Sequence, residues 1–208
     1  LGWVVGFNHT LLKTSNGGSD WELSYPILSG DFNDIYFSNE SNGYIVGTIT
    51  SIPKEDIILK TTDAGNTWIE INSPSNNGLN SVQFCNNSVG YAVGGNTSGI
   101  GGYTWSTILK TTDGGINWAF CNSPVKADLF DVSFADSVNG WTVGYGGRIL
   151  ATYDGGLNWN LQPTGTDQSL YSVCSVNKYF VWASGNEGTI LHSTNGGVTF
   201  IGEGNNFA

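Results

Sequence analysis

The sequence TTDGGINW at residues 111–118 decides the fold, because close copies of it occur in four other places. The copies read TSNGGSDW at 14–21, TTDAGNTW at 61–68, TYDGGLNW at 152–159 and STNGGVTF at 193–200. The third residues of successive copies are 47, 50, 41 and 41 positions apart. Repeats of roughly 20 to 50 residues indicate stacked supersecondary units. We call the eight-residue phrase the box and expect five similar units.

Two other features repeat in step with the box. An aromatic residue, preceded by Gly in four units, stands ahead of each box, at Trp3, Tyr44, Tyr91, Trp141 and Trp182. An apolar stretch begins sixteen residues after the third residue of each of the first four boxes, at Phe32, Leu79, Leu129 and Leu170. These stretches alternate with a period of two, which is typical of strands. Each unit therefore contains four short strands, the last beginning at the box Trp.

Four-stranded units at this spacing predict an all-β fold, a β-propeller of antiparallel blades. A β-helix and a sandwich are less consistent alternatives, since a β-helix coil is shorter and a sandwich has no reason to repeat its letters. The chain is expected to be a single propeller domain or a propeller segment. The predicted blades cover residues 1–28, 29–76, 77–126, 127–167 and 168–208.

The first unit lacks an inner strand, because Leu1 follows the point where that strand would end. Two interpretations stay open. The ring closes on five blades, or the chain is a segment of a longer propeller of six to eight. The absence of Met favours the segment.

The second and third units exceed the 41-residue unit by six and nine residues, inserted between their second and third strands. The inserts are spelled TITSIPKED at 48–56 and GNTSGIGGYTWS at 95–106. This hairpin opens on the face that carries the blade-to-blade connections, and insertions gather where proteins bind. Aromatic residues there can stack on a sugar or anchor a protein partner. The candidate ligand-binding residues are Asp56, Asn96, Tyr103 and Trp105.

The box itself is predicted to be structural. An Asp at the head of a tight turn accepts hydrogen bonds from backbone N–H groups of that turn, and the closing aromatic residue packs between sheets. Two copies replace Asp by Asn, an exchange that a turn cap tolerates and a metal ligand or general base does not. The structural polar positions are Asn16, Asp63, Asp113, Asp154 and Asn195, and the aromatic ones are Trp21, Trp68, Trp118, Trp159 and Phe200.

The box matches the Asp-box, or BNR, signature S/T-x-D-x-G-x-T-W. The stretch DVSFADSVNGWTVGYGGRILATYDGGLNW at 131–159 resembles the repeat of the photosystem II stability and assembly factor family, and the resemblance extends over essentially the whole chain. It implies a propeller. Sialidases, other glycoside hydrolases and sorting receptors share the signature, so it specifies fold better than function. The assembly family presents an arginine-rich face to its membrane-protein client, whereas this chain has Arg148 alone. The resemblance is therefore carried over for the fold only.

Charge excludes several classes of partner. The 208-residue chain has a net charge of −10, and its seven cations do not cluster, which argues against nucleic acids and anionic membranes.

The cysteines, Cys85, Cys121 and Cys174, lack metal-site spacing and are expected to be small buried residues, with a disulfide as the minority interpretation. No cofactor, metal site or catalytic residue is predicted. One Arg cannot supply the three that grip a sialidase substrate.

A glycoside hydrolase that uses two carboxylates remains the alternative function. Asp34 and Asp131 share one inner-strand column, but they stand two blades apart, and we expect them to lie too far from each other to act together. The preferred prediction is a non-catalytic binding or scaffolding module, extracellular or at the cell surface of a bacterium. Its partner is a glycan or a protein, held on the face with the enlarged loops. Ligand identity, blade number and oligomeric state are left open.

Overall fold

The computed structural model describes residues 1–24, 30–49, 55–96 and 105–203. Within these residues the chain is all-β, with one three-residue 3-10 turn at Asn186–Gly188. No helix among the described residues is long and apolar enough to cross a membrane. The first ten strands are β1 Gly2–Gly6, β2 Thr10–Thr14, β3 Glu22–Ser24, β4 Asp31–Phe37, β5 Gly43–Ile49, β6 Glu55–Thr61, β7 Ile69–Glu70, β8 Leu79–Phe84, β9 Gly90–Asn96 and β10 Trp105–Thr111. The others are β11 Ala119–Phe120, β12 Leu129–Phe134, β13 Gly140–Gly144, β14 Arg148–Thr152, β15 Asn160–Gln162, β16 Leu170–Ser175, β17 Val181–Gly185, β18 Ile190–Ser193 and β19 Ile201–Gly202.

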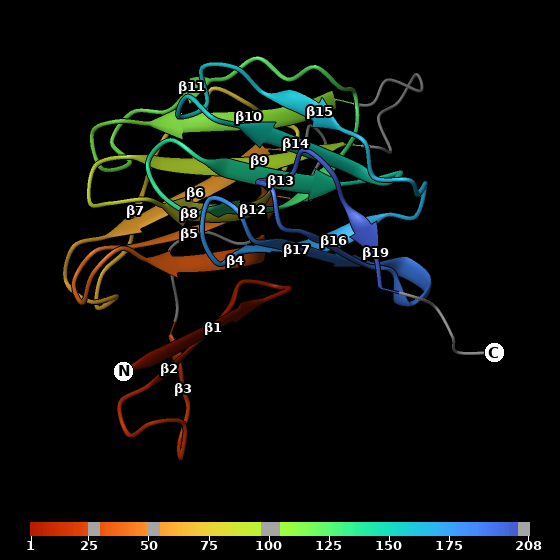
Figure 1. Cartoon of the computed structure of the whole chain (residues 1–208). Helices are drawn as coiled ribbons and strands as arrows, with labels where there is room; N and C mark the ends of the chain where they lie inside the picture. The colour runs from red at the N-terminus through yellow and green to blue at the C-terminus, as the bar shows by residue number, and fades with distance from the viewer. Residues whose placement is uncertain (25–29, 50–54, 97–104, 204–208) are drawn as a thin grey trace.

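The strands form five antiparallel sheets in chain order, which we call blades 1 to 5. Blade 1 has three strands, β1 to β3, and the others have four each, from β4–β7 to β16–β19. Each blade is a meander whose neighbouring strands are consecutive in sequence. The inner strands β4, β8, β12 and β16 lie next to one another in that order. Figure 1 shows blades 2 to 5 layered into one body, from which blade 1 projects. The predicted propeller architecture is confirmed.

Every inner strand carries an irregularity at the same place. The register with the second strand shifts between Phe32 and Asp34 in β4, and at the equivalent positions of β8, β12 and β16. A bulge re-aims the side chains beside it. In β4 the bulged residue Asn33 donates through its side-chain amide to the carbonyl of Leu79 in the next blade, at 2.7 Å. The bulges therefore join successive inner strands.

The core lies between the blades rather than inside one sheet. Box tryptophans Trp68, Trp118 and Trp159 are only 5–7% exposed. Each packs edge-on against an aromatic ring at the end of its own inner strand, as Trp118 does on Phe84 at 5.9 Å between centroids. Because a single four-stranded sheet cannot bury both of its faces, stability depends on this stacking of neighbours.

The two inserts enlarge strands as well as loops. Strands β5, β6, β9 and β10 have seven residues each, whereas β13 and β14 of blade 4 have five. Part of each insert, including Thr48 and Asp56, is therefore strand, in register opposite one another. Blades 2 and 3 thus extend farther than blade 4 on the face with the blade-to-blade connections.

Candidate functional site

The box forms a closed turn around its acidic residue. In blade 2 the Asp63 carboxylate accepts hydrogen bonds from the backbone N–H of Thr67 at 2.8 Å and from the hydroxyls of Thr67 and Thr61, both at 2.7 Å. The Thr61 hydroxyl oxygen in turn accepts from the N–H of Gly65 at 2.9 Å. These bonds within the turn lower the pKa of Asp63 to about 2, chiefly through the backbone N–H of Thr67. The carboxylate therefore caps the turn and, because its pKa is low, is a poor proton acceptor.

The two Asn boxes keep this turn geometry with an amide in place of the carboxylate. Asn16 accepts from the N–H of Asp20 at 3.0 Å and donates its amide to the Asp20 carboxylate at 2.8 Å. Asn195 likewise accepts from the N–H of Thr199 and donates to its hydroxyl, at 3.0 and 2.9 Å. Position seven of the box therefore pairs with position three, a pairing that the spacing of the repeated letters could have indicated.

Neighbouring blades are joined by a contact that we call the aromatic lock. Tyr91, on the second strand of blade 3, stacks on Phe134 of blade 4 at 3.9 Å between centroids. Its hydroxyl donates to the carbonyl of Gly155 at 2.7 Å, and its ring covers Gly156, where an added Cβ would meet it at 2.8 Å. The equivalent pairs of ring and box glycine are Trp3 with Gly65, Tyr44 with Gly115 and Trp141 with Gly197.

Lysines of one repeat column reinforce the lock. Lys13 donates to the side-chain oxygen of Asn66 in the next blade at 2.8 Å, and Lys110 donates to the carbonyl of Gly155 at 2.6 Å. Both ammonium groups also lie over the lock ring of their own blade, at 4.9 Å from Trp3 and 5.5 Å from Tyr91. These cations are connectors between blades, with no anionic ligand implied.

The inner-strand carboxylates are closer together than we predicted. The hydroxyl oxygen of Ser81 lies 3.0 Å from Asp34 and 2.9 Å from Asp131. Their nearest oxygens are therefore no farther apart than these two hydrogen bonds laid end to end, which is near the separation of about 5 to 9.5 Å used by glycosidases. The expectation that a distance of two blades keeps them too far apart is wrong, because both side chains reach Ser81 on the single intervening strand, beside the bulges.

Both carboxylates are nonetheless engaged by backbone. Asp34 accepts from the N–H groups of Val82 and Ile35, at 2.9 and 2.8 Å. Asp131 accepts from those of Val132 and Val173, at 2.9 and 2.8 Å. Burial raises the pKa of Asp34 despite these bonds. The pair therefore bridges blades 2 to 5.

The predicted ligand-binding residues divide into two groups. Tyr103 lies outside the described residues, and Asn96 and Trp105 end β9 and begin β10, where their side chains are not described. Asp56 is described: it accepts from the Ser73 hydroxyl at 2.6 Å and from the N–H of Gly78 at 2.7 Å. It therefore fixes the connection between blades 2 and 3 at the base of the first insert. Its role toward a ligand stays a prediction.

The remaining features considered are possible metal ligands, the cysteines and one hollow. Among the described residues no group of three or more His, Cys, Asp or Glu could hold a metal ion. Cys85, Cys121 and Cys174 are free thiols. The first two are only partly buried, and the expected burial is wrong for Cys174, which is exposed on blade 5. Burial raises the pKa of Cys85 to about 11. A hollow of about 390 Å³ lies between blades 3 and 4, lined by residues such as Lys110, Trp118 and Leu157, away from the inserts.

Comparison with known proteins agrees with this geometry. A family model described as photosynthesis system II assembly factor YCF48 matches residues 1–76 and 115–201. A search of curated proteins finds no match. YCF48 from Cyanidioschyzon merolae is 17% identical over 97% of this chain and 66% of its own, with a TM-score of 0.69. A GH74 enzyme from Niastella koreensis is 16% identical over 96% of this chain and 35% of its own, with a TM-score of 0.71.

A third structure, described as YCF48 bound to a D1 peptide, is 22% identical over 97% of this chain and 76% of its own, with a TM-score of 0.48. The chain thus spans about two thirds of the length of the Cyanidioschyzon merolae structure and about one third of that of the GH74 enzyme. Such identities show the fold alone. The family model, in contrast, matches most of the sequence, and the lock and the box recur throughout it. The chain belongs to the YCF48 photosystem II assembly factor family.

Proposed function

We propose that the chain is a non-catalytic binding module that holds a protein partner on the face formed by the enlarged hairpins 48–56 and 95–106. The observation that carries the proposal is that the repeated carboxylates act as acceptors for backbone N–H groups, as Asp63 does for Thr67 and Asp34 for Val82. Carboxylates used in this way build a rigid frame. The longer strands β5, β6, β9 and β10 extend this frame on the face of the two inserts.

The base of this face is rigid and polar. Asp56 anchors the connection between blades 2 and 3. Farther along this connection, the side chains of Ser75 and Asn77 contact the Thr107 hydroxyl at 3.3 and 3.2 Å. Loops on a rigid frame are well placed to bind, because less entropy is lost on association. The description of the family as an assembly factor favours a protein over a glycan. The net charge of −10 favours a neutral or basic segment of that partner.

Composition supports an extracellular or cell-surface location, because the chain has few charges and many Asn, Ser and Thr residues. This location is part of the proposal. Fractionation of the source cells, with detection of the chain by a specific antibody, tests it.

Binding can be measured by isothermal titration with two probes, the D1 peptide named for the YCF48 structure and a panel of neutral and basic peptides, with a glycan array in parallel. Trp105→Ala and Glu55→Ala alter the two hairpins, whereas Glu70→Ala changes an exposed acidic residue on the outer strand β7. We expect peptide binding that the hairpin variants weaken and Glu70→Ala leaves unchanged. Binding to glycans alone, or peptide binding insensitive to both hairpin variants, would remove the proposal.

Glycoside hydrolysis is the second candidate, favoured by the approach of Asp34 and Asp131 to one hydroxyl. A GH74 enzyme shares the fold. The test is hydrolysis of a panel of β-glucans and sialosides by purified protein, compared with Asp131→Asn. Turnover that this substitution abolishes supports an enzyme. No turnover removes this candidate and leaves the binding module standing.

A further inference from the structure

The hollow between blades 3 and 4 is walled by two exposed apolar side chains. Phe120 belongs to the outer strand β11 and is 58% exposed, and Leu157 belongs to the box turn of blade 4 and is 73% exposed. Both line the hollow of about 390 Å³, together with Trp118, which is buried, and Cys121, which is partly buried. Each of the two blades thus contributes an apolar wall that solvent reaches.

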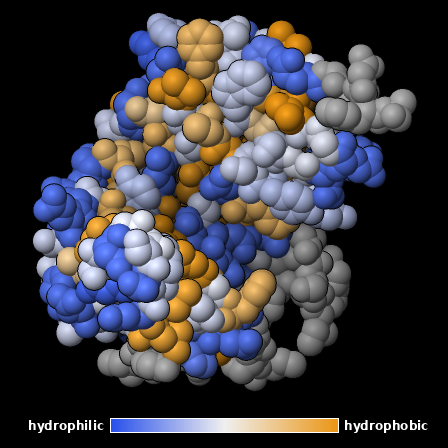
Figure 2. Space-filling view, turned by 90° about the horizontal axis from the view of Figure 1, so that it is seen from below, coloured by the Kyte–Doolittle hydropathy of each residue, from blue (hydrophilic) through white to orange (hydrophobic). Residues whose placement is uncertain are grey.

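The repeat shows that the fold does not require apolar residues at these two positions. In blade 2 the equivalents of Phe120 and Leu157 are Glu70 and Asn66, both exposed. Asn66 accepts a hydrogen bond from Lys13 at 2.8 Å, a contact that Leu157 cannot make. Single exposed apolar residues are ordinary, and Figure 2, seen from the side of blade 1, shows hydrophobic residues scattered among hydrophilic ones. Phe120 and Leu157 differ from these because they line one hollow.

A carboxylate stands at the margin of the hollow. Asp113 lines it, and one oxygen of its carboxylate accepts from the backbone N–H of Asn117 at 2.9 Å, while the other accepts from the Asn117 side-chain amide at 2.7 Å. A carboxylate oxygen has two lone pairs, so the second oxygen can accept from another donor. Lys110 also lines the hollow, but it donates to the carbonyl of Gly155 at 2.6 Å. The charge left for a ligand is therefore negative.

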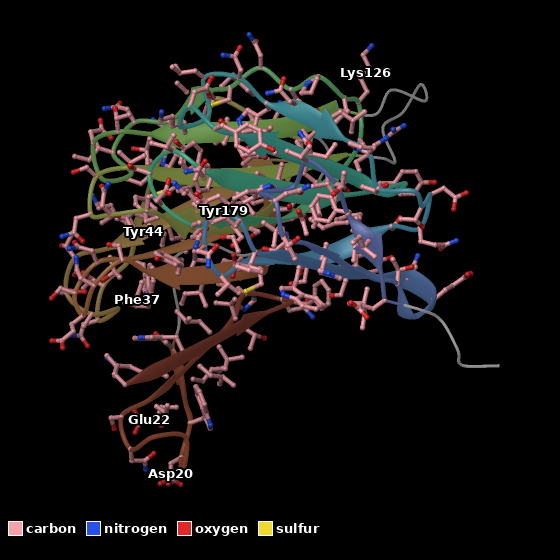
Figure 3. The ribbon with its side chains drawn as sticks, viewed as in Figure 1. Asp20, Glu22, Phe37, Tyr44, Lys126 and Tyr179 are labelled. Atoms are coloured by element: carbon pink, nitrogen blue, oxygen red, sulfur yellow. The ribbon has the colours of Figure 1, made fainter. Side chains whose placement is uncertain are left out.

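The hollow opens on the side of the box turns, away from the enlarged hairpins. Figure 3 labels Tyr44, whose ring covers the box residue Gly115, and Lys126, which lies on the connection between blades 3 and 4. The two labels lie toward opposite ends of the blades. Leu157 is a box residue and therefore lies at the Tyr44 end, whereas the hairpins lie at the Lys126 end. The hollow and the hairpin face can be occupied independently.

We propose that the hollow binds an extended segment of a protein partner, in which a bulky apolar side chain enters between Phe120 and Leu157 and a neighbouring Lys or Arg pairs with Asp113. A hollow of about 390 Å³ accommodates a large side chain. Strand β11 is the edge strand of its sheet, so an extended backbone can lie beside it. The carboxylate and the net charge of −10 favour a basic segment. The proposal does not depend on the function of the hairpin face.

The neighbouring hollow between blades 2 and 3 supplies a matched control. It has about 380 Å³ and is lined by Ile116, the equivalent of Leu157, and by Glu70, the equivalent of Phe120. One of its two walls is therefore polar. A segment that needs both apolar walls should bind between blades 3 and 4 and leave this hollow free.

Amide chemical shifts, followed by NMR during titration with capped tetrapeptides, test the binding. The probes are acetyl-Ala-Phe-Arg-Ala-amide, the same peptide with Glu in place of Arg, and the same peptide with Ala in place of Phe. We expect the Phe-Arg peptide, at millimolar concentration, to shift the amides of Ala119, Cys121 and Gly156, which line the hollow. Each of the other two peptides should bind roughly tenfold more weakly or worse, because each lacks one of the two contacts.

Three variants and one control assign the binding to the hollow. Phe120→Gln and Leu157→Asn introduce polar residues similar or identical to those that blade 2 carries at these positions, so the fold accepts them. Both should raise the dissociation constant of the Phe-Arg peptide by roughly tenfold. Asp113→Asn keeps a turn acceptor, as Asn195 does, and should make the Arg and Glu peptides bind equally. Ile116→Asn makes the same change in the neighbouring hollow and should have no effect.

Several results would overturn the proposal. They are the absence of any shift with the Phe-Arg peptide, shifts spread over other surfaces, an equal response to all three peptides, and binding that Phe120→Gln and Leu157→Asn leave unchanged. Sedimentation velocity that shows self-association abolished by Phe120→Gln would also overturn it, because the occupant would then be a second copy of the chain. Glu55→Ala, on the hairpin face, should leave binding of the Phe-Arg peptide intact, so failure of one site is distinguishable from failure of the other.

Discussion

Asp34 on β4 and Asp131 on β12 approach each other through a single hydroxyl, that of Ser81 on the intervening strand β8. A hydroxyl has one hydrogen to donate, so both contacts are hydrogen bonds only when one carboxyl holds a proton. Burial raises the pKa of Asp34, and the charge of Asp131 adds a smaller effect in the same direction. Asp34 is therefore the group that binds the proton. This hydrogen-bond network joins blades 2, 3 and 4, and its protonation changes with pH.

The stability of the protein should depend on the protonation of Asp34. A carboxyl whose pKa is higher in the folded than in the unfolded chain, here above 3.8, binds protons more strongly when folded. Its contribution is therefore complete below pH 3.8 and is lost as pH rises through the folded value. We expect Asp34→Asn, measured by urea denaturation, to gain stability relative to wild type as pH rises from 3.5 to about 7. A difference that stays constant across this range would contradict the assignment.

The box aspartates should behave in the opposite way. Hydrogen bonds from the N–H and side-chain amide of Asn117 hold the pKa of Asp113 at about 2. Its stabilising effect is present above 3.8 and is lost as pH falls through about 2. We expect Asp113→Asn to be more stable than Asp113→Ala at neutral pH, because Asn keeps an acceptor for the backbone, as Asn195 does. Melting temperatures at pH 7 and pH 2.5 check both the rank and the loss of the wild-type advantage.

The aromatic locks can be compared in pairs. Tyr44 donates to the carbonyl of Gly114 at 2.9 Å, and Tyr91 donates to that of Gly155, which also accepts from Lys110. Tyr44→Phe leaves the carbonyl of Gly114 without this donor. In Tyr91→Phe the carbonyl of Gly155 still accepts a hydrogen bond from Lys110. We expect Tyr44→Phe to cost about 1–3 kcal/mol of unfolding free energy and Tyr91→Phe about 0.5–1 kcal/mol. Chemical denaturation measures both. Equal costs would mean that the hydrogen bond from Lys110 does not compensate for the loss of the Tyr91 hydroxyl.

The sequence was sufficient to place the strands and the box turn within one repeat unit. A spacing of sixteen residues located β8 at Leu79 and β12 at Leu129, because each strand belongs to a unit of fixed length. The box turn was also predictable, since the partners of Asp63 lie within four residues of it. Periodicity and local hydrogen bonding decide these features without reference to the rest of the chain.

Contacts between units could not be read in the same way. Tyr91 reaches Gly155, 64 residues away, and no local pattern specifies that pairing. The proximity of Asp34 and Asp131 depends on bulges that a strict alternation of two does not predict. A signal was available in the fifth residue of the box, a glycine that a ring of the preceding blade covers in blades 2 to 5.

That covering ring leads to a prediction about glycine. Gly156 and Gly165 both have positive φ, +78° and +72°, so an Ala at either position is strained by about 1–2 kcal/mol. Only Gly156 lies under a ring, with Tyr91 2.8 Å from an added Cβ, whereas nothing lies within 4 Å of one at Gly165. We expect Gly156→Ala to cost about 1–3 kcal/mol more than Gly165→Ala, because the lock must open to admit the methyl group. Urea denaturation of the two variants isolates this term, since the backbone strain is common to both. If the two variants prove equally stable, the Tyr91 ring moves aside at no cost in free energy, and the stacking of the blades depends on the contacts between strands alone.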